Sequence, residues 1–452
     1  MRSIFVNIKQ LTGITPAGTL RLQGDEMSRS GSIEDAWLTV EEGRISGFGE
    51  MKDRPAGDFD ETVDAEGCLM MPSFCDSHSH IVYAGTREEE FIDKINGLSY
   101  EEIAARGGGI LNSADLLHAT GEDSLYEQSL ARVKEMMAHG SGAIEIKSGY
   151  GLTVEDELKM LRVIRRIKES VPAVIRATFL GAHAVGRAYS GRKDAYVSLI
   201  VNEMIPRVAE HGLADFIDVF CDEGFFSPED MDRILSEGGR HGLRPKVHVD
   251  EIAVIGGMET ALRHGALSVD HLERTGEAGI GALRGSDTMP TMLPGSSFFL
   301  GLPYGRARDF ISNGLGIALA SDFNPGSSPS GDMRFVMAQG CIKMKLTPIQ
   351  ALNACTINGA YAMGVSDICG SIEVGKLANL ILTRPIPSLG FIPYCYTTPF
   401  IRTHYIKGRP CTATGGHGEG KARARDTPHK TLHGYSRVKL SGLRSLSAED
   451  GP

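Results

Sequence analysis

Two histidines separated by one residue, His78 and His80, carry the clearest chemical signal in the sequence. They lie in Asp76-Ser-His-Ser-His80, at the end of an apolar run that is typical of a buried strand. Because residues i and i+2 of a strand project from the same face, both imidazoles can bind one metal ion. The pair alone does not decide between two metal ligands and two structural histidines.

Two further residues favour the metal interpretation. His248 ends a later apolar run, and Asp322 ends another within Ala320-Ser-Asp-Phe-Asn324. Three neutral imidazoles and a carboxylate suit Zn²⁺ or Fe²⁺ and leave a position for water, whose pKa falls from roughly 16 to about 7 on such an ion. The run Val219-Phe-Cys-Asp222 offers no lysine that could be carbamylated to bridge two ions. We therefore expect one divalent metal, Zn²⁺ or Fe²⁺, held by His78, His80, His248 and Asp322.

Three more polar residues are candidates for catalysis. Glu251 follows His248 by three positions, and His271 ends another apolar run. Either residue can move protons between a bound water and a leaving nitrogen, or can instead orient a metal ligand through a hydrogen bond. His183, which ends Thr178-Phe-Leu-Gly-Ala-His183, can polarise a substrate carbonyl. The sequence does not decide how catalysis divides among Glu251, His271 and Asp322.

The elements that must position these residues alternate between apolar, strand-like runs and helical stretches such as 154–170 and 228–241. Eight β/α units between residues 73 and 364 predict a TIM barrel, whose active site lies at the carboxyl ends of the strands. The alternative, a doubly wound sheet, usually carries a glycine-rich dinucleotide motif after its first strand, and this sequence has none there. The eight runs end near His78, Lys147, His183, Asp222, His248, His271, Pro294 and Asp322.

The two ends of the chain differ from its middle. Residues 1–72 and 365–412 contain short extended stretches broken by glycines, prolines and polar turns. We expect them to form one discontinuous β-sandwich domain beside a catalytic barrel domain of residues 73–364. Residues 413–452 are rich in glycine, serine and basic residues and have almost no hydrophobic periodicity, which predicts a disordered basic tail.

Composition narrows the class of function. The chain has 452 residues, of which 41% are hydrophobic and 23% are charged, as in ordinary globular proteins. Its net charge of −10 disfavours nucleic acid and acidic membrane surfaces as partners. The sequence contains no run of about 18 apolar residues, the length needed to span a membrane. The eight cysteines form no C-x-x-C pair, so we expect reduced thiols in a cytoplasmic protein that acts on a small molecule.

Several motifs resemble those of known enzymes. The His-x-His pair, together with His248, His271 and Asp322 at successive strand ends, resembles the metal-dependent amidohydrolases. Longer stretches, covering roughly residues 1–410 in all, are similar to the imidazolonepropionase family of histidine degradation. These stretches are Glu145-Ile-Lys-Ser-Gly-Tyr-Gly151, Thr178-Phe-Leu-Gly-Ala-His183, His248-Val-Asp-Glu251, Leu293-Pro-Gly-Ser-Ser-Phe-Phe299 and Ser321-Asp-Phe-Asn-Pro-Gly-Ser-Ser-Pro329.

The resemblance implies a reaction and a set of substrate contacts. It implies hydrolysis of 4-imidazolone-5-propionate, a cyclic amide, to N-formimino-L-glutamate by a homodimer. The guanidinium of Arg87 can hold the propionate carboxylate in a bidentate geometry, and Gly326 lets the backbone approach a ligand closely. By this resemblance, the metal ligands are His78, His80, His248 and Asp322, and the substrate contacts are Arg87, Tyr150, His183, Glu251, Asn324, Gly326 and Ser327.

Two alternatives are open at this point. Another mononuclear amidohydrolase, such as a nucleobase or guanidine deaminase, would share the metal ligands and the His248-x-x-Glu251 spacing but would release ammonia. A catalytically inactive barrel scaffold would retain no metal. Arg87, Tyr150 and residues 324–327 suit a carboxylate-bearing ring and therefore favour the imidazolone substrate.

Overall fold

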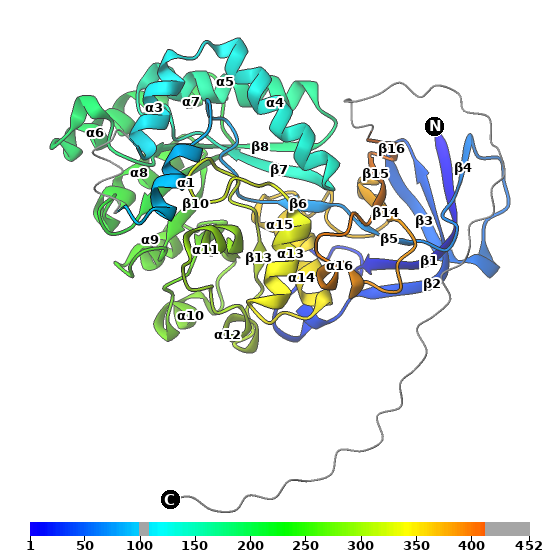
Figure 1. Cartoon of the computed structure of the whole chain (residues 1–452). Coiled ribbons are helices and arrows are strands. Elements are labelled where there is room, and N and C mark those ends of the chain that lie inside the picture. The colour runs from blue at the N-terminus through cyan, green and yellow to red at the C-terminus, as the bar shows by residue number, and fades with distance from the viewer. Residues whose placement is uncertain (99–107, 412–452) are drawn as a thin grey trace, which may run out of the picture. The chain divides into compact units, whose positions relative to one another are not determined.

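Eight parallel strands form a barrel in the centre of the chain (Figure 1). The computed structural model describes residues 1–98 and 108–411. Each of the eight predicted apolar runs is a strand of this barrel, and each strand ends within a few residues of the predicted position. The strands pair in sequence order: β6 (Phe74–Asp76), β7 (Ser141–Lys147), β8 (Val174–Ala182), β9 (Phe216–Cys221), β10 (Arg244–Val249), β11 (Ser268–His271), β12 (Met289–Met292) and β13 (Ala318–Leu319).

The first and last strands meet through the residues that follow them. Ser79 and Phe323 form an isolated parallel bridge. The backbone N–H of Asp322 donates to the carbonyl of His78 at 3.0 Å, and that of His80 donates to the carbonyl of Phe323 at 2.9 Å. These bonds continue the barrel at its carboxyl end and bring two predicted metal ligands from one strand next to a third from the other.

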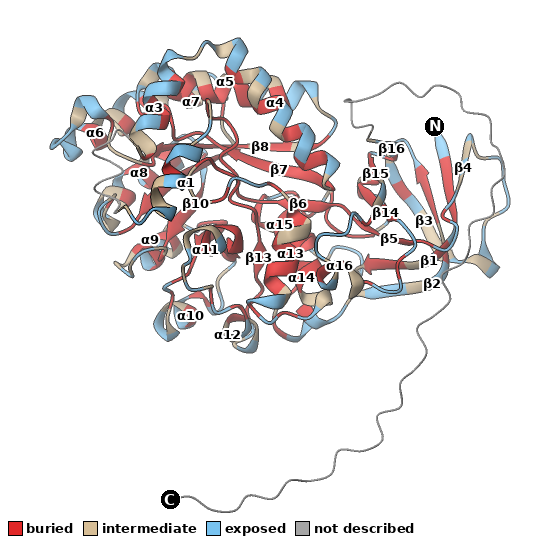
Figure 2. Ribbon diagram, viewed as in Figure 1, coloured by how far each residue is buried: buried red, intermediate tan, exposed pale blue. Residues whose placement is uncertain are grey.

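The barrel strands are buried along most of their length, as their apolar sequences predict. All seven residues of β7 are buried, and Figure 2 shows the barrel strands as buried while the outer faces of the surrounding helices are exposed. A parallel strand is covered on both faces, by the barrel interior and by helices, so its sequence is apolar throughout rather than alternating. Charged residues inside these strands are therefore exceptions that require partners.

Helix ends follow local capping signals. Helix α5 (Val154–Ser170) has the predicted bounds, because the Thr153 hydroxyl accepts a hydrogen bond from the backbone N–H of Asp156. Helix α8 (Pro228–Arg240) begins with a reciprocal capping box between Ser227 and Asp230. The other described α-helices are α1 (Glu88–Ile95), α3 (Ile110–Ala119), α4 (Glu122–Ala138), α6 (Lys193–Leu199), α7 (Ile205–Glu210), α9 (Gly257–Arg263), α10 (Glu277–Leu283), α11 (Pro294–Leu300), α12 (Ala307–Ser312), α13 (Met333–Ile342), α14 (Pro348–Cys355), α15 (Ile357–Ala362) and α16 (Phe391–Tyr394).

A separate mixed sheet draws its strands from both ends of the chain. Strand β14, from the C-terminal part, pairs antiparallel with β5, which directly precedes the barrel. The predicted fold class, a barrel accompanied by a discontinuous β part, is confirmed. The domain boundaries at residues 72 and 365 stay predictions, and the tail predicted over residues 413–452 lies outside the described residues. The sheet contains β1 (Arg2–Ile14), β2 (Gly31–Glu41), β3 (Arg44–Glu50), β4 (Glu61–Asp64), β5 (Leu69–Pro72), β14 (Leu380–Thr383), β15 (Ile401–Ile406) and β16 (Arg409–Pro410).

Two expectations about the whole chain can be compared with the structure. All eight cysteines are free, as their scattered positions predict. Within residues 1–98 and 108–411, no helix combines the length and the apolar character needed to cross a membrane.

Candidate active site

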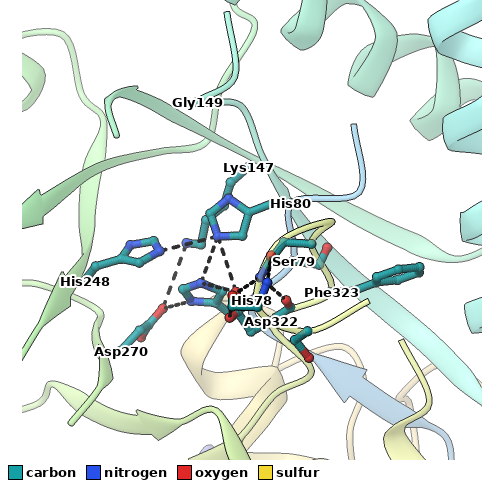
Figure 3. Close-up of polar contacts among 12 residues, drawn as sticks. His78, Ser79, His80, Lys147, Gly149, His248, Asp270, Asp322 and Phe323 are labelled. Carbon is teal, nitrogen blue, oxygen red and sulfur yellow. Dashed lines mark hydrogen bonds and ion pairs between the residues drawn. The ribbon is translucent and has the colours of Figure 1, made fainter. Parts of the chain in front are cut away.

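The structure brings the four predicted metal ligands together at the carboxyl end of the barrel (Figure 3). The Nε2 atoms of His78 and His80 are 3.1 Å apart, and the Nε2 atoms of His80 and His248 are 3.4 Å apart. Oδ1 of Asp322 lies 3.5 Å from Nε2 of His78 and 3.6 Å from Nε2 of His80. Ligands bound at about 2.0–2.1 Å to a tetrahedral metal lie about 3.3 Å from one another, so this spacing suits a metal ion.

The hydrogen bonds of the outer imidazole nitrogens support the same conclusion. Nδ1 of His78 lies 2.7 Å from Oδ2 of Asp270, and Nδ1 of His248 lies 2.9 Å from Oδ2 of Asp218. Asp218 is held ionised by its neighbours, and an ionised carboxylate only accepts hydrogen bonds, so Nδ1 of His248 carries a proton. Nδ1 of His78 faces a carboxylate oxygen of Asp270 in the same way. The Nε2 lone pairs then face one another and the Asp322 carboxylate, an arrangement that a cation stabilises. The donor set therefore fits a divalent metal.

A group of five charged side chains, the buried charge cluster, lies behind these ligands and was missed by the sequence analysis. Nζ of Lys147 is 2.9 Å from Oε1 of Glu145, 2.9 Å from Oδ2 of Asp218 and 3.9 Å from Oδ2 of Asp270. Lys246 completes the cluster at 3.7 Å from Asp270, and none of the five side chains has exposed surface. Figure 3 shows Lys147 and Asp270 beside the ligand histidines.

Charges within the buried charge cluster oppose the effect of burial on Lys147 and Asp218. Burial by itself would lower the pKa of Lys147, but the carboxylates of Asp218, Glu145 and Asp270 outweigh burial and raise the pKa above its ordinary value. Burial by itself would raise the pKa of Asp218, but His248 and Lys147 together hold it well below its usual range. Asp218 is thus kept as the anion that orients His248.

The alternation of side chains between the two faces of a strand could have revealed part of this cluster from the sequence. Lys246 precedes His248 by two residues, and Glu145 precedes Lys147 by two, so each pair projects from the same face of its strand. A charged residue at that position in an apolar run points into the barrel. The sequence alone does not show which strands supply the opposite charges.

His271 lies between two carboxylates at the edge of the metal-ligand group. Its Nε2 is 3.5 Å from Oε2 of Glu251, and its Nδ1 is 3.4 Å from Oε2 of Glu273. Burial alone would lower the pKa of His271, but the two carboxylates raise it to about 10. Burial raises the pKa of Glu251 to about 7, although His271 opposes the shift. Ring nitrogens of His271 and of two ligand histidines also lie within 4.8 Å of one another, so His271 borders the metal position itself.

Local backbone strain helps to aim two of these side chains. His271 has a φ of 88° and Asp322 has a φ of 53°, both in the left-handed region that non-glycine residues seldom adopt. Such conformations cost on the order of 1–3 kcal/mol each and concentrate at functional sites. Both occur where a barrel strand gives way to its loop, so the chain turns there and directs the side chains into the mouth of the barrel.

His183 is held in one tautomer by the backbone. Its Nδ1 lies 3.0 Å from the carbonyl oxygen of Gly149, which can only accept, so Nδ1 carries a proton. Burial lowers the pKa of His183 to about 3, so the ring is neutral and Nε2 is an acceptor. This pattern favours an acceptor role for His183 over the carbonyl-polarising role that we expected from the sequence.

A cavity of about 260 Å³ opens beside the metal-ligand group. Burial raises the pKa of Tyr150, which lines the cavity, so its phenol remains protonated. His78 is the one predicted site residue that does not line the cavity; it is fully buried beneath it. The predicted residues in the lining are His80, Arg87, Tyr150, His183, His248, Glu251, His271, Asp322, Asn324, Gly326 and Ser327.

Arg87 reaches the cavity against the backbone of Gly326. A Cβ atom built at residue 326 would overlap the Arg87 guanidinium, which explains the need for glycine there. The guanidinium also forms a bidentate pair with Glu90, at 2.9 Å from Nε and 2.5 Å from Nη2. Lys94, which the sequence analysis did not single out, lines the same part of the cavity.

Asn324 uses its whole side-chain amide within its own loop. Its Oδ1 accepts from the backbone N–H groups of Gly326 and Ser327, both at 2.8 Å. Its Nδ2 donates to the carbonyl of Asp322 at 2.7 Å and to the Ser327 hydroxyl at 2.8 Å. An amide makes four hydrogen bonds at most. The structure therefore favours a role in shaping the 322–327 loop over the direct side-chain contact that the resemblance implied.

Comparisons with known proteins agree with this geometry. Residues 69–403 match the amidohydrolase family. The chain is 51% identical over 409 residues to the imidazolonepropionase of Christiangramia forsetii and 50% identical over 409 residues to that of Flavobacterium johnsoniae; each match covers 90% of this chain and 100% of the relative. An adenosine deaminase from Xanthomonas campestris with bound zinc has a TM-score of 0.67 at 16% identity, covering 90% of this chain and 92% of that one. The last likeness shows the shared fold alone.

Proposed function

The chain belongs to the amidohydrolase family and, within it, to the imidazolonepropionases, and we propose that its metal-dependent site opens the ring of 4-imidazolone-5-propionate. Water is added across the bond between the ring carbonyl carbon and the adjacent nitrogen, which yields N-formimino-L-glutamate. The observation that carries this proposal is one cavity lined by three metal-ligand side chains, His80, His248 and Asp322, and by the guanidinium of Arg87. A metal ion held by these ligands suits an amide carbonyl, and the guanidinium suits a carboxylate.

The metal is proposed to be Zn²⁺ or Fe²⁺, held by His78, His80, His248 and Asp322. When bound, such an ion acidifies a coordinated water and polarises the substrate carbonyl. The spacing of the ligand atoms and the protonated outer nitrogens support a single ion, and the donor set accepts either element.

Substrate orientation falls to residues on the opposite side of the cavity. Nε2 of His183 accepts a hydrogen bond from a ring N–H, because Nδ1 is already committed to Gly149. Tyr150 remains a phenol and donates to the ring or to its side chain. Arg87 binds the propionate carboxylate, with Gly326 and Ser327 forming the adjoining backbone surface.

Proton transfer is assigned to Glu251 and His271. Glu251 lines the cavity and is unprotonated above a pKa of about 7, so it accepts a proton from the attacking water near neutral pH. His271, protonated between Glu251 and Glu273, delivers a proton to the ring nitrogen as the C–N bond breaks. In this scheme Asp322 is proposed as a metal ligand, and the transfer of protons is left to Glu251 and His271.

The test is a direct assay. The metal-loaded enzyme is mixed with imidazolonepropionate generated fresh from urocanate, and ultraviolet absorbance and ammonia are both followed. We expect loss of absorbance without ammonia, and no loss with His78→Ala, which lacks one ligand. Failure of a metal-replete sample to consume the compound would overturn the proposal and direct attention to deaminase substrates.

Assembly and location are proposed from the resemblance. We expect a homodimer in the cytoplasm that acts on a small-molecule substrate, with neither nucleic acid nor membrane as a partner. Light scattering of the purified protein tests the dimer, for which the mass of two chains is expected.

A further inference from the structure

Lys94 is a second cation in the wall of the cavity, beside Arg87. Its Nζ donates to the carbonyl oxygen of Gly326 at 3.3 Å, on the same glycine that packs against the Arg87 guanidinium. The side chain is partly buried, and burial together with the charge of Arg87 lowers the pKa of Lys94. Among the described residues that line the cavity, Arg87 and Lys94 are the only lysine or arginine side chains.

The charge of Arg87 is already balanced within the protein. Glu90 accepts from Nε and Nη2 of Arg87, and the two side chains are only 11% and 10% exposed. Oε1 of Glu90 also accepts from the backbone N–H of Gly109 at 2.9 Å, which fixes the carboxylate in place. The pair therefore contributes directed N–H donors to the cavity but little net positive charge.

Lys94 adds the net positive charge that the Arg87–Glu90 pair lacks. An ammonium has three N–H donors, and the contact with Gly326 uses one of them. A partly buried ammonium attracts a carboxylate more strongly than an exposed one, because less water screens the charge. A carboxylate placed beside Arg87 and Gly326 therefore lies within reach of two cations from one helical segment, the N-cap and the last turn of α1.

We propose that Lys94 is a specificity-determining residue that binds the substrate carboxylate jointly with Arg87. The proposal rests on the proposed function, because it assigns to Lys94 the propionate group of that substrate. Arg87 supplies the directed hydrogen bonds, and Lys94 supplies the net charge that distinguishes a carboxylate from a neutral chain of equal length.

Two variants and two probes test the proposal. Steady-state kinetics are measured for Lys94→Met and Lys94→Arg, and calorimetry measures the dissociation constants of 3-(imidazol-4-yl)propionate and 4-propylimidazole, which differ in the carboxylate. Lys94→Met is expected to raise KM and to weaken the carboxylate probe by about tenfold to a hundredfold, the effect of losing one charged hydrogen bond. The neutral probe should bind equally to both proteins, kcat should change less than KM, and Lys94→Arg should restore most of the loss.

A matched control is Lys9→Met. Lys9 lies in the mixed sheet, and its ammonium also donates to backbone carbonyls, those of Ile386 at 3.1 Å and Pro387 at 2.8 Å. This variant should bind both probes as the wild type does. An unchanged ratio of the two dissociation constants in Lys94→Met, whether neither probe is weakened or both are weakened equally, would overturn the assignment of Lys94. Absence of hydrolysis by the wild type would reject the proposed function. Calorimetry needs no turnover, so the ratio of the two probes' dissociation constants would still test the assignment of Lys94.

Discussion

Replacing Lys147 with methionine should destabilise the protein strongly, since this lysine is the hub of the buried charge cluster. The variant keeps most of the side-chain volume but removes a cation that lies 2.9 Å from Glu145 and 2.9 Å from Asp218, all three side chains having no exposed surface. Removing one partner of a buried ion pair costs about 3–5 kcal/mol, because the remaining charge stays desolvated. Here two carboxylates lose their nearest cation, so we expect at least the lower figure.

The assay is urea unfolding of the metal-free protein, with a chelator present so that metal binding does not contribute to the free energy of unfolding. Adding Glu145→Gln to Lys147→Met should recover about 1 kcal/mol or more, because it removes one of the uncompensated charges. Lys168→Met is the control: its Nζ lies 3.9 Å from Asp215 and its side chain is 50% exposed, so the cost should stay below about 1 kcal/mol.

Metal affinity provides an independent readout of the same perturbation. Without Lys147, Asp218 loses one of the charges that keep it ionised, and His248 is less firmly oriented. Outer partners of this kind typically change metal affinity by about 10- to 100-fold. A Lys147→Met protein with wild-type stability and wild-type metal affinity would refute the reasoning, as would a double variant less stable than the single one.

Three other perturbations give distinct readouts. Gly326→Ala should lower kcat/KM by about tenfold or more in steady-state assays, because the new Cβ displaces Arg87, and an unchanged KM would contradict the proposed carboxylate contact. The value of kcat/KM should rise with pH towards a plateau above about 7, where Glu251 is unprotonated. The residual activity of Glu251→Gln should not show this rise with pH. A rise that persists in the variant would assign the pH dependence to another group. Burial lowers the pKa of His404 to about 4 from an ordinary value of 6.5, so the unfolded chain binds an extra proton between these pH values and stability falls by up to about 3 kcal/mol as the pH drops. Urea unfolding across that range should show a smaller loss for His404→Gln, and an equal loss would locate the acid sensitivity elsewhere.

Local sequence signals predicted the barrel, and they singled out the residues that the structure brings together as a candidate metal site. The apolar runs end at the carboxyl edge of the barrel because the buried strands give way there to polar active-site residues, as at His248 and His271. Helix 154–170 was predicted to the residue, since its cap, Thr153, acts within three positions. The side-chain role of Asn324 was also readable in principle, because an asparagine before Pro-Gly-Ser commonly bonds to the backbone just beyond it.

Contacts across long sequence separations could not be predicted in this way. Asp270 meets His78 across 192 positions, and Lys94 meets Gly326 across 232. Each contact depends on the barrel's closure and on how helix α1 lies over its mouth, which hydrophobic periodicity does not specify. Lys94 resembles any exposed helical lysine in the sequence, and only the folded chain distinguishes it.

Isotope labelling of the product tests the central claim most directly. The metal-loaded enzyme is supplied with imidazolonepropionate in H₂¹⁸O, and the product is analysed by mass spectrometry. Ring opening at the carbonyl predicts N-formimino-L-glutamate with one ¹⁸O in its α-carboxylate and no ammonia, and no labelled product when His78→Ala replaces the wild type. An intact ring with released ammonia, or a product without the label in that carboxylate, would contradict the account.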